Sequence, residues 1–227
     1  MLFTWSNMKY VIHACNKRMW YVEEFLYPSL IKRGIPKENI EINEDTTLAG
    51  CLFSTLESFR KNSKYKGGTW YIQDDVAICH DFYKLTKEHD EGVVCGFWHH
   101  HYEEGDLNPG KTPVMKMGYS FPCIRIPNDI AGEFVQWFYE DAYFREEYKS
   151  WIEQKKHVDS FFRDFMHERY KEDYVYNLKP SIVEHVDWLI GGSTINKWRP
   201  WICRATYWKD KDIIEELQAK LEQRDNG

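Results

Sequence analysis

Two adjacent aspartates end an apolar, strand-like run of this chain. The run from Gly68 to Ile72 is rich in β-branched and aromatic residues, which is typical of a buried parallel strand. Gln73, Asp74 and Asp75 follow at once, and carboxylates at such a strand end lie where ligands bind in open α/β sheets. Neighbouring acids repel each other and lose hydration when buried, so a divalent cation with phosphate oxygens would stabilise them. The alternative is that they only cap the next turn.

Two later segments also carry side chains suited to chemistry. Asp159 is an isolated acid at a predicted helix start, where aspartate is favoured as a simple N-cap. His185 lies within the segment 180–187, and one interpretation of it is a buried structural histidine. Three consecutive histidines at 99–101 favour a polar loop rim over a metal site.

The elements that must position these residues alternate between strands and helices. Strands are predicted at 9–14, 40–43, 68–72 and 92–98. Helices are predicted between them at 17–33, 48–59 and 81–88. This order predicts an α/β fold with a mostly parallel central sheet and right-handed crossovers. Beyond a loop at 105–113, one or two strands are expected within 115–126, and helices at 131–143, 146–172 and 210–224.

In their order along the chain, the three motifs resemble those of nucleotide-sugar glycosyltransferases of the GT-A fold. In that family a strand-end acidic motif, DxD or a variant such as EDD, holds Mn²⁺ or Mg²⁺ on the sugar-nucleotide diphosphate. A late P-S-x-V-x-H segment, matched here from Pro180 to His185, supplies a histidine near the diphosphate or metal. The resemblance implies one GT-A-like (Rossmann-like) domain over 1–227. Its parts would be a nucleotide-sugar-binding half at about 9–126, an acceptor and catalytic half at about 127–208, and a C-terminal helix at 209–227.

The same resemblance implies a divalent cation at the strand end. Asp75 and His185 would bind Mn²⁺ or Mg²⁺, and Asp74 would face the donor, a UDP-sugar such as UDP-glucose. Gln73 departs from the family pattern, because an amide is a poorer cation ligand than the carboxylate expected at the first motif position.

Further donor contacts follow from the resemblance. Asn16 and Arg18 would lie beside the nucleotide, and the guanidinium fork of Arg18 matches a phosphate; a solvated arginine on a helix face is the alternative. Asp45 would lie near the base, and Asp159 would take the proton of the acceptor hydroxyl. The remaining implied donor contacts are Gly191, Gly192, Ser193 and Arg199.

The motifs also resemble small bacteriophage glycosyltransferases, some of which add sugars to hydroxymethylated pyrimidines in phage DNA. A DNA acceptor would be held by the segment 197–204, which interleaves Lys and Arg with Trp; the alternative is a packed strand edge. The formal net charge of −6 argues against broad nucleic-acid binding, so any DNA contact must be local. A cell-surface or protein-linked glycan is the competing acceptor.

Composition and spacing narrow the remaining classes. The six cysteines are scattered without a CxxC pair, which favours free thiols in a reducing cytoplasm over a zinc site. No window approaches the roughly 18 apolar residues of a membrane span, and no signal peptide is apparent. Two rival classes stay open, a non-catalytic nucleic-acid-binding phage protein and a metal-dependent phosphohydrolase or nuclease. The latter ranks lower, because two metals usually need a second acidic cluster.

Overall fold

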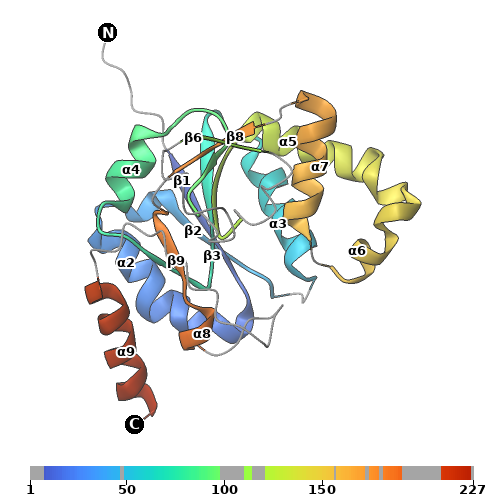
Figure 1. Ribbon diagram of the computed structural model, residues 1–227. Helices are drawn as coiled ribbons and strands as arrows, with labels where there is room; N and C mark the ends of the chain where they lie inside the picture. The colour runs from blue at the N-terminus through green and yellow to red at the C-terminus, as the bar shows by residue number, and fades with distance from the viewer. Residues whose placement is uncertain are drawn as a thin grey trace.

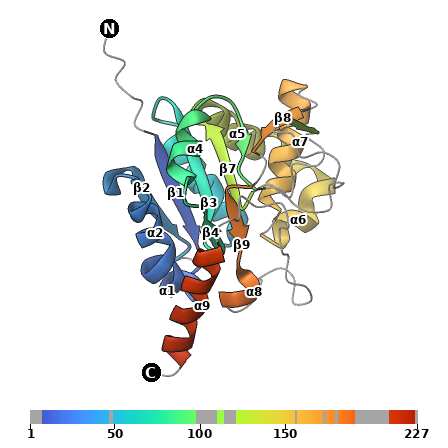
Figure 2. The ribbon, with the colours of Figure 1, turned by 60° about the vertical axis from the view of Figure 1, so that its left-hand side comes forward.

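In the computed structural model, a twisted sheet lies between two layers of helices (Figures 1 and 2). The structure describes residues 8–46, 49–97, 110–113, 121–155, 157–171, 174–178, 181–190 and 211–225. None of the helices in these ranges has the length and apolar character needed to cross a membrane.

The main sheet has the strand order β2-β1-β3-β7-β5-β8-β6. Its strands are β1 (Lys9–Ala14), β2 (Ile40–Glu44), β3 (Gly68–Gln73), β5 (Val94–Cys95), β6 (Gly110–Pro113), β7 (Cys123–Pro127) and β8 (Tyr174–Asn177). β1 pairs in parallel with β2 and β3, and β5 with β8, whereas β7 is antiparallel to β3 and β5, and β6 to β8. Strands β2, β1, β3, β5 and β8 therefore run in one direction, and the sheet is mostly parallel.

Side chains alternate between the two faces of the central strands, as a sheet buried on both sides requires. On β3, Trp70 and Ile72 enter one hydrophobic core and Tyr71 enters the other. The first core is covered by η1 (Asn16–Arg18), α1 (Met19–Tyr21), η2 (Val22–Leu26), α2 (Tyr27–Lys32) and α4 (Phe82–Glu88), with η3 (Lys37–Asn39) leading into β2. The second is covered by α3 (Cys51–Asn62), α5 (Asn128–Glu140) and α7 (Val158–Tyr170), with η5 (Ala142–Phe144), η6 (Glu146–Tyr148) and α6 (Lys149–Glu153) beside them.

The C-terminal helix α9 (Lys211–Asp225) docks on the first layer (Figure 2). Leu217 is fully buried against that core. Pro28 has no N–H to give to the Glu24 carbonyl one turn earlier, and this carbonyl instead accepts a 2.8 Å hydrogen bond from Lys220 Nζ. The π-helical turn η2 lies just before Pro28, where the α-helical ladder is interrupted.

A separate two-stranded ribbon crosses one end of the sheet. It pairs β4 (Val76–Ile78) with β9 (Val183–His185) in antiparallel register, so that Val76 faces His185. The short helix α8 (Asp187–Ile190) follows β9 directly. The ribbon therefore brings a segment from late in the chain to the residues that follow β3.

The structure confirms the predicted α/β class, with a mostly parallel sheet, flanking helices and a helical C-terminal extension. Several boundaries were wrong. The predicted loop at 105–113 ends in strand β6. Of the strand predicted at 92–98, the structure describes residues 92–97, and within them only the two residues of β5 form a strand. The helical region predicted at 146–172 consists of η6, α6 and α7. The break between α6 and α7 lies where Lys155 and His157 adopt left-handed backbone angles, with φ of 54° and 65°.

Candidate functional site

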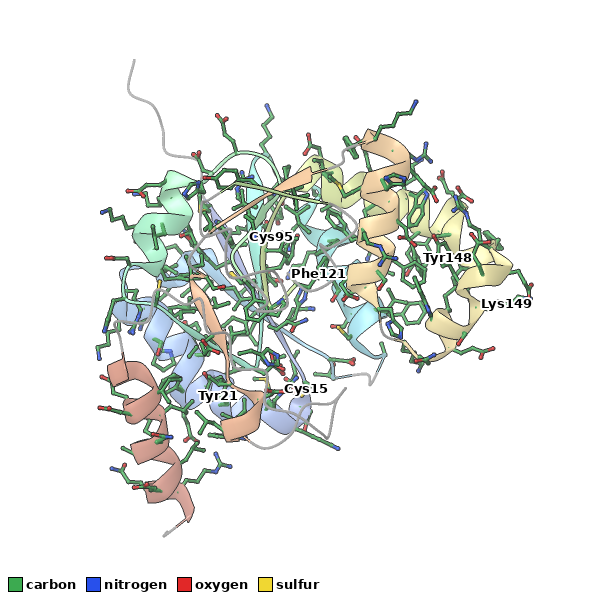
Figure 3. All side chains as sticks on the ribbon, in the orientation of Figure 1. Cys15, Tyr21, Cys95, Phe121, Tyr148 and Lys149 are labelled. Carbon is green, nitrogen blue, oxygen red and sulfur yellow. The ribbon has the colours of Figure 1, made fainter. Side chains whose placement is uncertain are left out.

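The carboxyl ends of β1, β2 and β3 meet at one edge of the sheet, and the predicted polar residues follow them. Because the strands are parallel, their register places His13 beside Gln73 and Ala14 beside Glu44. Backbone groups then join the three loops: Asp45 N–H donates to the Ala14 carbonyl at 2.9 Å. Figure 3 shows the labelled Cys15 and Tyr21 at this end of the sheet.

Arg18 holds both aspartates of the strand-end motif. Its Nη2 lies 2.6 Å from Asp74 Oδ1, and its Nη1 lies 2.6 Å from Asp75 Oδ2. All three residues are buried, with exposed fractions of 8%, 2% and 6% for Arg18, Asp74 and Asp75. The second oxygen of Asp74 accepts the backbone N–H of Cys15 at 2.6 Å. The guanidinium predicted to meet a phosphate therefore lies between the two carboxylates and compensates their charge.

The two aspartates have opposite electrostatic environments. Burial raises the pKa of Asp74 above its ordinary value, although Arg18 acts against it. Burial would also raise the pKa of Asp75, but the positive charges of His185 and Arg18 outweigh it and leave the pKa well below the ordinary range. Asp75 is therefore the more firmly ionised of the pair.

His185 reaches the same point from the ribbon. Its Nε2 lies 3.4 Å from Asp75 Oδ1, and the N–H of Val186 donates to the Asp75 carbonyl at 2.8 Å. Burial would lower the pKa of His185, but the Asp75 carboxylate and the nearby Asp187 raise it to about 10. The sequence predicted that Asp75 and His185 act together, and the β4–β9 ribbon is the element that joins them.

Asp75 Oδ1 and His185 Nε2 are suited to a divalent cation. Asp75 Oδ1 is buried and has no hydrogen-bond partner among the described residues, whereas Oδ2 is used by Arg18. Within the described ranges, no group of three or more His, Cys, Asp or Glu side chains is placed to hold a metal ion. A cation here would thus take one carboxylate, one imidazole and oxygens from water or a diphosphate. The carboxylate and the water or diphosphate oxygens are usual ligands of Mg²⁺ and Mn²⁺, and the imidazole is an addition to that oxygen set.

Asn16 and Asp45 flank this site. Asn16 is exposed and donates from Nδ2 to Glu44 Oε1 at 3.3 Å. Asp45 accepts the backbone N–H groups of Ala49 and Gly50, each at 2.8 Å, through separate carboxylate oxygens. The structure thus gives Asp45 a role in ordering the loop before α3, and its predicted contact with a base stays a prediction.

Asp159 lies in the first turn of α7, which begins against the start of α3. The N–H of Leu52 donates to the Lys155 carbonyl at 3.1 Å. Gly50 packs so closely against Lys155 that a Cβ atom at position 50 would lie only 2.6 Å from the Lys155 Cβ. Asp159 Oδ1 accepts the N–H of Ser160 at 2.8 Å, and the N-cap position is occupied by His157 instead. The anticipated N-cap alternative for Asp159 is therefore wrong.

Asp159 and the strand-end pair belong to one electrostatic neighbourhood. Desolvation of the Cys51 thiol and the negative charges of Asp159, Asp74 and Asp75 together raise the pKa of that thiol. No contact joins Asp159 to Asp75 or His185 within the described residues. The start of α3 lies within electrostatic reach of both sets of acids.

The remaining predicted site residues, Gly191, Gly192, Ser193 and Arg199, lie outside the described residues, as do the histidines at 99–101. Sequence reasoning missed two contributors. One is the backbone N–H of Cys15, which carries no side-chain signal. The other is Tyr21, whose buried hydroxyl donates to the Val76 carbonyl at 2.9 Å and fixes the chain just after Asp75.

Comparison with known proteins gives likenesses of fold only. No protein-family model and no curated protein sequence matches the chain. Similar solved structures include A197 from STIV, with 17% identity, a TM-score of 0.41, and 78% of this chain and 83% of that chain covered. Another is the galactosyltransferase LgtC in complex with donor and acceptor sugar analogs, with 13% identity, a TM-score of 0.41, and 94% and 96% covered. HddC from Yersinia pseudotuberculosis has 12% identity, a TM-score of 0.29, and 55% and 79% covered. These likenesses assign neither a family nor an activity to this chain.

Arg18→Ala tests the charge compensation at the strand end. The variant leaves two buried carboxylates without their cation, so the free energy of unfolding should fall by about 3–5 kcal/mol. Urea unfolding measures the loss, and Arg60→Ala is the matched control, because Arg60 pairs with Glu57 on the exposed surface of α3. Added Mn²⁺ should restore more stability to Arg18→Ala than to the wild type. An Arg18→Ala variant no less stable than Arg60→Ala would show that Arg18 does not compensate the pair.

Proposed function

We propose that this chain is a nucleotide-sugar-dependent glycosyltransferase that uses Mn²⁺ or Mg²⁺. The observation that carries the proposal is the meeting of Asp75 and His185, from two distant segments, beside a buried carboxylate oxygen without a donor. The position of the pair at the carboxyl end of a mostly parallel sheet supports it, since ligands bind there in open α/β folds. A UDP-sugar is the proposed donor.

The proposed reaction forms a bond between an acceptor oxygen and the anomeric carbon of the sugar. The bond from that carbon to the diphosphate oxygen breaks, and its electron pair leaves with the diphosphate. The cation, when bound, would stabilise the charge that develops on the leaving diphosphate. Asp75 and His185 hold and orient the diphosphate end of the donor, while Arg18 keeps both strand-end carboxylates in place. Asp159 accepts the proton of the acceptor hydroxyl.

For the acceptor we propose a hydroxymethylated pyrimidine in DNA, on the sequence resemblance and the Trp- and Arg-containing segment 197–204, which lies outside the described residues. A glycan is the second candidate, and one described feature favours it. Tyr139, Tyr143 and Phe144 are exposed, Phe144 by 74%, and the acids Glu140 and Asp141 lie between them in the chain. Flat rings next to carboxylates suit a neutral sugar better than a polyphosphate.

Asp75→Asn tests the donor and metal site. In a thermal-shift experiment with UDP and Mn²⁺, ligand at about 100 times its Kd should stabilise the wild type by roughly 2.7 kcal/mol. Asp75→Asn should lose most of this shift and most transfer activity, because an amide is a weak cation ligand. The control is Asp90→Asn, a change at an exposed loop acid. Full activity of the wild type in excess EDTA, or of Asp75→Asn, would refute the metal role.

Asp159→Ala tests the base. Transfer should fall by roughly 10²–10⁴-fold with little change in UDP affinity. Asp129→Ala is a matched control, because Asp129 Oδ1 accepts the N–H of the next residue at the start of α5 in the same way. Burial raises the pKa of Asp159, so the base is protonated and inactive at a higher pH than an ordinary aspartate. The acid limb of the pH–rate profile should therefore lie above about 3.9 and be absent in the variant. Loss of UDP binding instead would make Asp159 a donor ligand.

The acceptor is tested by incubating the enzyme with hydroxymethyl-pyrimidine DNA and a panel of nucleotide sugars. The DNA is then digested to nucleosides for mass analysis, and a nucleoside heavier by one hexose is the expected product. Glycan acceptors are incubated in parallel. Labelled glycan with unmodified nucleosides would refute the DNA acceptor and retain the glycosyltransferase.

A further inference from the structure

Asp187 is a third buried acid at this site, and none of the steps above uses it. It is 2% exposed and begins α8, two residues beyond His185. Its Oδ1 lies 3.0 Å from Nδ1 of His185, on the opposite side of the ring from Asp75. The imidazole is therefore held between two carboxylates, one at each nitrogen.

Burying the Asp187 carboxylate costs free energy unless a neighbouring group pairs with its charge. Its ion-pair partner within the described ranges is His185. Neither Asp187 Oδ1 nor His185 Nδ1 makes a hydrogen bond within those ranges, and their 3.0 Å contact is an ion pair. Asp187 Oδ1 and His185 Nδ1 are therefore available to interact with each other.

The backbone fixes the spacing of these groups. Val186, between His185 and Asp187, donates its N–H to the Asp75 carbonyl at 2.8 Å and accepts the N–H of Leu189 at 2.9 Å. One residue therefore ties the strand-end loop, the end of β9 and the start of α8 together. A shift of Asp187 relative to Asp75 would break these bonds.

An imidazole that offers Nε2 to a cation must carry its proton on Nδ1, and an acceptor at Nδ1 fixes that tautomer and the orientation of the ring. We propose that Asp187 is a positioning residue that accepts the Nδ1 proton of His185 and directs Nε2 toward the cation and diphosphate beside Asp75. This inference rests on the proposed function. Asp187 itself touches neither cation nor donor and acts through His185.

The test measures Mn²⁺ affinity in the presence of UDP by calorimetry. It also measures the protonation of the His185 ring nitrogens by ¹⁵N NMR, with Mg²⁺ and in metal-free protein above pH 10, because the raised pKa of about 10 leaves the metal-free ring doubly protonated at lower pH. Asp187→Ala should weaken Mn²⁺ binding by about 10–100-fold and remove the preference for a proton on Nδ1. Asp187→Asn keeps an oxygen of the same shape and should fall between Asp187→Ala and the wild type. If Asp187→Ala does not fold, the comparison of Asp187→Asn with the wild type decides.

Glu184→Gln is the matched control. It removes another buried carboxylate from β9, but Glu184 and His185 are adjacent in the strand and point to opposite faces. Mn²⁺ affinity and the His185 tautomer should be unchanged in this variant. An unchanged tautomer in a folded Asp187 variant would overturn the inference. A changed tautomer in a protein whose wild type binds no Mn²⁺ with UDP would instead refute the proposed function and leave the positioning role standing.

Discussion

Two adjacent aspartates buried at a strand end are the constraint on which this part of the structure depends. Their charges would repel each other and oppose folding if the surrounding chain did not compensate them. Compensation comes from three directions: the guanidinium of Arg18 after β1, the N–H of Cys15, and the imidazole of His185 from the ribbon. Arg18 and Cys15 both follow β1 and His185 ends β9, so the carboxylates after β3 tie these three strands to one another.

The charges of Asp74 and Asp75 are compensated by different groups, so the two carboxylates differ in which oxygens can bind a further ligand. Both oxygens of Asp74 are occupied, one by Arg18 and one by the Cys15 N–H, which leaves the residue a role in holding the strand ends. Asp75 gives one oxygen to Arg18 and keeps the other toward His185. From Gln73 in the first motif position, the sequence analysis predicted the metal at Asp75 and the donor facing Asp74, and both roles stay predictions. In the structure, Arg18 contacts one oxygen of each acid, and the second oxygens of Asp74 and Asp75 differ in their partners.

The predictable part of the fold is the part with a local signal. Strands β1 and β3 and helices α5 and α9 have apolar patterns long enough to recognise, and they lie within a few residues of their predicted ranges. The three-residue strands β4 and β9 have no such pattern and form only because they pair with each other across a long stretch of chain. For the same reason the partner of Arg18 was not predictable: a guanidinium fits a phosphate and a pair of carboxylates equally well, and only the parallel register brings the carboxylates to it.

The charge balance of the described site bears on how a donor would bind. Before any cation binds, Arg18 and the protonated His185 bring two positive groups, and Asp74, Asp75 and Asp187 bring three acidic ones, all within one buried neighbourhood. A diphosphate entering here would meet more negative than positive charge. Its approach therefore requires further positive charge, and the free oxygen of Asp75 beside His185 is where a cation accompanying the diphosphate would be held. If the proposed function holds, donor and cation would therefore bind as a pair, each supplying ligands or charge that the described residues lack.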